Sequence, residues 1–132
     1  MKFFICGMDG VSLGIPAEQT ERVISAPHVQ DSVYKSENGE AFISIPLLFR
    51  LQDPSAPHGI VLKPMADAEP KKPKTVLLTP SIDIDLEIPE ESIHGIPEAL
   101  SGLRQYFRGA CFTDEEMILI LNPEKLTEKY ND

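Results

Sequence analysis

The sequence has too few cysteines to be a cross-linked small domain. Only two of its 132 residues are cysteines, Cys6 and Cys111, and both lie in apolar, strand-like surroundings. We expect two buried, reduced thiols, with a disulfide between them as the alternative. A chain of this length buries roughly two-thirds of its unfolded surface, so it needs neither a disulfide nor a metal to fold as one domain, residues 1–132.

Long apolar runs are absent as well. No stretch approaches the roughly 20 residues that a membrane-spanning helix needs. The apolar residues near the start end at Cys6, which is too short a run for the core of a signal peptide. We therefore expect a cytoplasmic protein without a membrane-inserted segment.

Positive charge is in the minority. The chain has 12 basic and 21 acidic residues and a formal net charge of -9. Such a chain repels the phosphates of nucleic acid and an anionic membrane surface, so neither is an expected partner. The charge suits a soluble protein that docks to neutral or basic protein surfaces.

Recognisable catalytic and metal-binding motifs are also missing. The three histidines are too far apart for a metal site, and no serine lies in a Gly-x-Ser-x-Gly turn. Asp83, Asp85 and Glu87 share one face of an alternating segment and could attract calcium, but no loop supplies further oxygen ligands. A solvated strand face is the better interpretation. We therefore expect no metal and no cofactor.

The strongest structural pattern is residues 108–121, RGACFTDEEMILIL. It predicts two strands joined by an acidic turn. The second arm, Met117 to Leu121, has no polar residue, which indicates a strand buried on both faces. Asn122 and Pro123 then favour the start of a short helix over residues 123–128.

Short strands separated by turn signals account for most of the remaining chain. The strictly alternating segment 81–88 predicts a half-buried strand, with Ile82, Ile84, Leu86 and Ile88 facing inward. Residues 65–74 combine charge and proline and are predicted to form a mobile loop. Eight to ten strands with turns every eight to twelve residues indicate an all-β barrel or sandwich with a few short helices.

Four patterns in order carry a resemblance to a known family: FFI…VSLGIPAE…ERVI, NGEAFISIPL, TVLLTPSID…LEIPE and FRG…ILILNPEKL. Together they resemble the CheW-like domain, the adaptor module of bacterial chemotaxis arrays, over nearly the whole chain. No single pattern is specific, and their order and spacing make the match. The resemblance implies two small SH3-like β-barrel lobes packed side by side along a hydrophobic seam. We place the lobe boundary near residues 52–58.

The resemblance also implies a function. CheW-like domains are non-enzymatic adaptors that bridge a receptor's cytoplasmic tip and the regulatory domain of a histidine kinase; a divergent member could instead compete for one of them. An apolar groove between the lobes is the expected binding surface. Alternatives from other classes are a small ligand-binding β-barrel and a hydrolase or metal enzyme.

The chain departs from the family at one turn. Where the family has Asn-Leu-Arg-Gly, this chain has residues 36–39, Ser-Glu-Asn-Gly, so an asparagine takes the arginine's place. The family turn contributes to contacts in the array, so we expect this region to be a protein-docking rim. The predicted protein-binding residues are those in and beside the turn and two arginines next to short helices: Lys35, Glu37, Asn38, Gly39, Glu40, Arg22 and Arg50.

Overall fold

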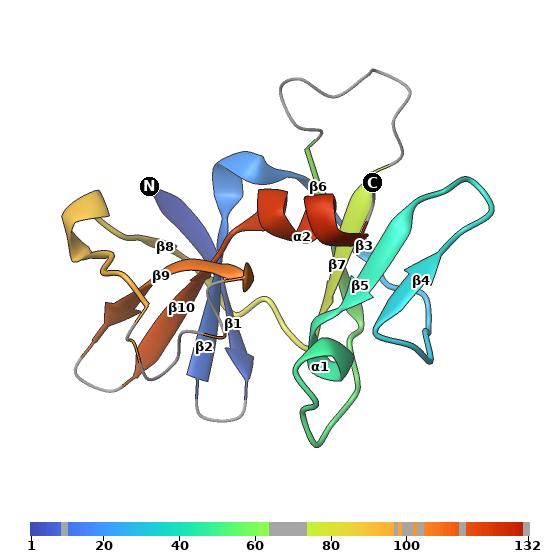
Figure 1. Ribbon diagram of the computed structural model, residues 1–132, viewed down its shortest axis with the longest axis horizontal. Helices are drawn as coiled ribbons and strands as arrows, with labels where there is room; N and C mark the ends of the chain where they lie inside the picture. The colour runs from blue at the N-terminus through green and yellow to red at the C-terminus, as the bar shows by residue number, and fades with distance from the viewer. Residues whose placement is uncertain are drawn as a thin grey trace.

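Two five-stranded sheets form the body of the molecule in the computed structural model (Figure 1). The structure describes residues 1–8, 11–63, 74–96, 98, 102, 105–113 and 116–130. The first sheet has the strand order β8-β1-β2-β10-β9, and the second has the order β3-β6-β7-β5-β4. The elements are β1 (Lys2–Met8), β2 (Val11–Pro16), η1 (Ala17–Gln19), β3 (Thr20–Ser25), β4 (Val33–Lys35), β5 (Ala41–Ser44), α1 (Ile45–Leu48), β6 (His58–Leu62), β7 (Thr75–Thr79), β8 (Ile84–Glu87), η2 (Glu90–Ser92), β9 (Phe107–Phe112), β10 (Met117–Leu121) and α2 (Pro123–Tyr130).

The two sheets have the same pattern of antiparallel and parallel neighbours, although the chain supplies their strands in a different order. In the first lobe, β8, β1 and β2 are antiparallel neighbours, β2 and β10 are parallel, and β10 and β9 are antiparallel. In the second lobe, β3, β6 and β7 are antiparallel, β7 and β5 are parallel, and β5 and β4 are antiparallel. A helix follows the corresponding strand in each lobe, α1 after β5 and α2 after β10. The all-β architecture of two small lobes with short helices is therefore as the sequence predicted.

Strand β10 is buried on both faces, as its apolar sequence predicted. Ile118 and Ile120 pack inside the first lobe with Phe3 and Ile5. The alternate residues of β10 face the other lobe. They belong to the cluster that we call the seam, which joins the sheets and consists of Cys6, Leu13, Ile15, Ile43, Ile45, Ile60, Leu62, Leu77, Ile96, Phe107, Ala110, Leu119, Leu121 and Leu126.

Strand β7 plays the same part in the second lobe. Val76 and Leu78 pack inside that lobe with Val61, while Leu77 enters the seam. Helix α2 lies above the space between the two sheets in Figure 1, and its Leu126 is fully buried in the seam. Each lobe thus has its own small interior, and the larger cluster lies between the lobes.

Local capping explains where both helices begin. The Ser44 hydroxyl accepts a hydrogen bond of 3.3 Å from the Leu47 amide, and proline lies in the first turn of α1. The Asn122 side-chain oxygen accepts a bond of 3.3 Å from the Lys125 amide at the start of α2. Helix α2 ends at Tyr130, two residues beyond its predicted end. Within the described residues, no helix combines the length and apolar character that a membrane crossing requires.

The prediction for residues 81–88 was partly wrong. Strand β8 covers only Ile84–Glu87, and the Ile84 side chain is 57% exposed instead of facing inward. In the part of the chain that the structure describes, β8 is an edge strand paired only with β1, and the core does not extend to Ile84. Ile88 is buried inside the first lobe, whereas Ile82 packs against the seam, where the chain crosses between sheets.

The predicted lobe boundary near residues 52–58 was also wrong. These residues connect α1 to β6, and both elements belong to the second lobe. The chain changes sheets between β2 and β3 and again between β7 and β8. Of the predicted mobile loop 65–74, all but Lys74 lies outside the described residues.

Candidate functional site

The predicted turn at residues 36–40 closes the hairpin of β4 and β5. The Gly39 amide donates to the Ser36 carbonyl at 2.9 Å, and the Ser36 amide donates to the Glu40 carbonyl at 2.9 Å. The Ser36 hydroxyl accepts a further bond of 3.1 Å from the Glu40 amide. Gly39 has a φ of 84°, in the left-handed region that glycine adopts without strain. The turn presents Glu37 and Asn38 to solvent.

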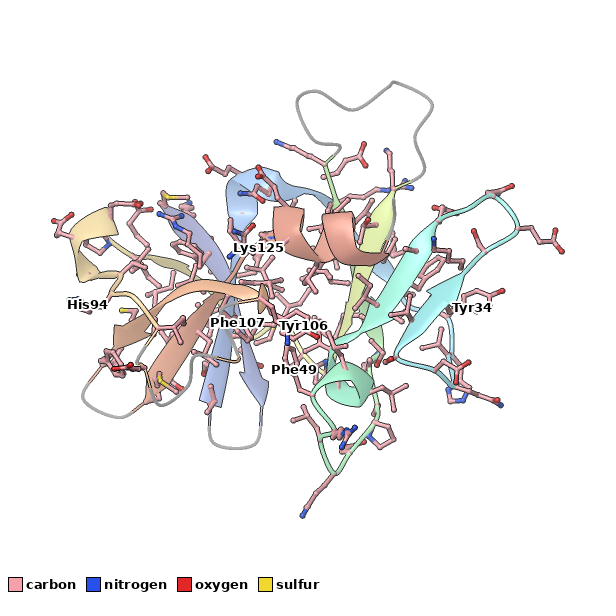
Figure 2. All side chains as sticks on the ribbon, in the orientation of Figure 1. Tyr34, Phe49, His94, Tyr106, Phe107 and Lys125 are labelled. Carbon is pink, nitrogen blue, oxygen red and sulfur yellow. The ribbon has the colours of Figure 1, made fainter. Side chains whose placement is uncertain are left out.

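An aromatic residue that the sequence interpretation did not single out lies beside this turn. Tyr34 on β4 is 49% exposed, and its ring centroid is 6.1 Å from that of Phe42. Figure 2 shows its side chain on the outermost strand of the second lobe. The only sequence signal was one aromatic residue in a short polar segment. The exposed ring of Tyr34 and the adjacent Lys35 therefore lie beside the turn.

The other two predicted residues lie elsewhere on the second lobe. Arg22 is on β3, at the opposite edge of the sheet from β4. Arg50 follows α1 and has a φ of 55°, which is uncommon for a residue with a β-carbon. The structure therefore brings together Lys35 and residues 37–40, and it separates them from both arginines.

The interface between the lobes is filled with side chains. Phe49, just after α1, packs edge-on against Tyr106 with ring centroids 5.6 Å apart and stacks on Phe107 at 5.5 Å. Figure 2 shows these three rings meeting between the lobes. An open pocket of about 550 Å³ lies instead in the second lobe, between residues 26–30 and 53–57, with Ser44, Leu47 and Leu78 completing its lining.

The three carboxylates of the acidic strand segment each lie beside a hydrogen-bond donor or a cation of the chain. The Gly7 amide donates to Asp83 at 2.9 Å, Asp85 is 3.9 Å from the Lys2 ammonium, and Glu87 is 2.9 Å from the N-terminal ammonium. Among the described residues, no three histidine, cysteine or acidic side chains are grouped so that they could hold a metal ion.

The arrangement of the two lobes is similar to that of a solved structure. This is the crystal structure of the scaffolding protein TtCheW from Thermoanaerobacter tengcongensis, which matches with a TM-score of 0.68 over 92% of this chain and 83% of that chain, at 15% sequence identity. The fold is CheW-like. No protein-family model and no curated protein sequence matches the chain. The fold implied by the sequence resemblance is thus confirmed from the arrangement of the strands.

One member of the seam is a buried thiol, Cys6. Cys6 is fully buried, and burial raises the pKa of its thiol to about 12, while the Thr79 hydroxyl acts more weakly in the opposite direction. A protonated, enclosed thiol is a poor nucleophile and a poor metal ligand. Cys6 and Cys111 are both buried and form no disulfide, as the sequence analysis expected.

Proposed function

We propose that the protein is a non-enzymatic adaptor of chemotaxis-type signalling. It binds the cytoplasmic tip of a receptor and the regulatory domain of a histidine kinase, or competes for one of them. The supporting observation is the CheW-like fold over 92% of the chain, shared with a protein described as a scaffold. The sequence resemblance, read along nearly the whole chain, points to the same role.

We place one contact surface at the β4–β5 turn. Lys35, Glu37, Asn38, Gly39 and Glu40 lie there in a hydrogen-bonded hairpin, beside the half-exposed Tyr34. Aromatic residues with polar neighbours are typical of protein interfaces. The surface is small, so the partner must also contact other parts of the molecule.

Arg50 is a separate candidate contact. Its left-handed backbone would suit glycine better, and an arginine in a strained position is explained if its side chain binds a partner. Arg22 belongs to a third surface, at the β3 edge. The proposed sites are therefore dispersed over the second lobe, which suits a protein that binds more than one partner.

The experiment measures binding of the full chain to a purified receptor cytoplasmic tip and to a purified kinase regulatory domain, by calorimetry. We expect micromolar binding to at least one of them. Glu37→Lys should weaken that binding about tenfold, which corresponds to ~1.4 kcal/mol. Glu91→Lys is the matched control, because it makes the same charge reversal on the exposed η2 of the first lobe. No binding to either domain would overturn the proposal.

The pocket in the second lobe favours a second candidate function, the binding of a small ligand. Its volume of about 550 Å³ lies within the range of ligand sites. However, two of its polar side chains already accept local bonds, Ser44 from the Leu47 amide and Asp53 from the Ser55 amide. The substitution Ala56→Trp would narrow the pocket. If the pocket binds a small ligand, the substitution should abolish that binding. If the pocket has no such function, the substitution should leave binding to the signalling proteins within about twofold.

A further inference from the structure

Strand β3 leaves part of its backbone without a partner strand. Among the described residues it pairs only with β6. The Ala26 amide donates to the Pro57 carbonyl at 2.9 Å, which fixes the alternation of bonded and open positions along the antiparallel pair. The peptide groups of Ile24 and Arg22 consequently face β6. Those of Val23 and Ser25 face away from the sheet.

Several side chains of β3 are exposed along the same open edge. Val23 is 47% exposed, and its neighbours Arg22 and Ser25 are exposed too. Edge strands are usually protected against pairing by charges, by bulges or by shortness. Strand β3 has an irregularity between Thr20 and Arg22, but the open positions lie beyond it. An extended segment could therefore hydrogen-bond along Val23 and Ser25.

Positive charge gathers at the start of the same strand. The Lys74 ammonium lies 2.5 Å from a Glu21 carboxylate oxygen. The Lys63 amide donates to the Gln19 carbonyl at 2.8 Å, which places Lys63 beside the beginning of β3. The hydrogen bond from Lys74 holds the pKa of Glu21 below its usual value, and the charges of Lys74, Arg22 and Lys63 act in the same direction. Three cations thus surround one carboxylate in a chain whose net charge is -9.

We propose that the β3 edge is the docking site for an acidic, extended segment of a partner protein, which adds to the second sheet as a sixth strand. Its backbone bonds to Val23 and Ser25, an apolar side chain covers Val23, and its carboxylates bind Arg22, Lys63 and Lys74. Strand addition of this kind takes its affinity from the main chain and its specificity from the side chains. The segment displaces Glu21 from Lys74, so Glu21 is an internal competitor.

A second copy of this chain is a poorer occupant of the edge. Two copies would each bring a net charge of -9, so general repulsion opposes their pairing. The proposed site does not rest on the adaptor function. The open backbone and the cations of the β3 edge would bind an acidic strand of any partner protein.

The first experiment uses three heptapeptides in which valine alternates with glutamate, glutamine or lysine. Binding to the full chain is followed by amide NMR shifts at low salt. We expect the glutamate peptide to bind about tenfold tighter than the glutamine peptide and to lose this advantage in high salt. The Val23 and Ser25 amides should shift and become protected from exchange. Equal binding of all three peptides, preference for lysine, or shifts confined to the β4 or β8 edge would overturn the proposal.

The second experiment uses variants that must change the affinity in opposite directions. Glu21→Gln should tighten binding of the glutamate peptide several-fold, because the lysine ammonium loses its internal carboxylate. Arg22→Glu with Lys63→Glu should weaken it at least tenfold. Lys2→Glu with Arg108→Glu, on β1 and β9 of the first lobe, is the control of equal net charge and should change the affinity less than threefold. If the control weakens binding as much as the test pair, the effect is general repulsion and the site is wrong.

These outcomes are separate from those for the adaptor function. A chain that binds the kinase domain but not the acidic peptide would retain the proposed function and lose this site. The reverse result would retain the site and lose the pathway. Thermal unfolding of every variant establishes that each one is folded before its binding is compared.

Discussion

The peptide groups of His94 and Ala110 exchange two hydrogen bonds of 2.8 Å. This bridge brings the segment after η2 back against β9 and gives the outer edge of that strand a partner. The approach is close because the neighbouring residue, Gly109, has no side chain. A β-carbon there would lie 2.5 Å from the His94 carbonyl oxygen and 2.9 Å from an Ile93 methyl carbon.

Gly109→Ala should therefore destabilise the protein by about 2–4 kcal/mol, since either the bridge or β9 must move. Thermal or denaturant unfolding measures this. Gly95→Ala is the matched control, because no atom lies within 4 Å of its added β-carbon, and it should change stability by less than about 0.5 kcal/mol. Equal effects of the two substitutions would show that the bridge is not tightly packed.

The seam should provide much of the packing energy of the fold. Leu77 is fully buried there, and Leu77→Ala should cost about 2–5 kcal/mol through lost burial and the cavity that it leaves. Phe112→Ala removes a larger side chain that is 55% exposed, and it should cost less than about 1.5 kcal/mol. A larger loss for Phe112→Ala than for Leu77→Ala would contradict the assignment of the seam as core. Denaturant unfolding of both variants measures the difference.

The Cys6 thiol should be inert in the native protein. In a Cys111→Ala variant, where Cys6 is the remaining thiol, a disulfide reagent at pH 8 should react at least about a hundredfold more slowly than with the unfolded chain. Reaction at the rate of a free thiol would mean that the seam is open to solvent.

The raised pKa of Cys6 also predicts a pH dependence. Because the folded state favours the protonated thiol, its contribution to stability is complete below the ordinary value of 9.0 and is lost as the pH rises from there towards about 12. Between pH 9 and pH 11, the free energy of unfolding should fall more steeply for the natural chain than for Cys6→Ala. Parallel curves for the two proteins would contradict this.

Lys74 should control the pKa of Glu21. Lys74→Met should raise this pKa towards its ordinary value of 4.5, because the hydrogen bond and the charge that stabilise the carboxylate are removed. A lowered pKa contributes stability above the ordinary value, and this contribution is lost as the pH falls through the folded-state value. NMR titration of the Glu21 carboxyl carbon measures the shift, and Lys2→Met should leave it unchanged.

Local patterns in the sequence predicted the features that depend on neighbouring residues. The apolar run of β10, the Asn122 cap and the turn ending at Gly39 each follow from a few adjacent side chains. Strict alternation placed Ile84 on the inner face, but alternation does not show where an edge strand extends past its core. The exposure of Ile84 depends on which strands lie beside β8.

Features that depend on distant residues could not be predicted in this way. Strands β2 and β10 pair in parallel although about a hundred residues separate them, so the membership of each sheet had no local signal. The family resemblance supplied the two lobes but not the sequence position at which the chain crosses between them. Arg22, Lys63 and Lys74 are likewise separated along the chain, and their gathering at β3 appears only once β3, β6 and β7 are side by side.

The order of the strands also has a consequence for synthesis on the ribosome. The second lobe is continuous in sequence, from β3 to β7, whereas the first lobe needs β1 and β2 from the beginning of the chain and β8 to β10 from its end. The hairpin of β1 and β2 is therefore synthesised before β8 and β10, the strands with which it pairs. The lobe translated in the middle has all its strands earlier, and its half of the seam is the surface on which the late strands assemble.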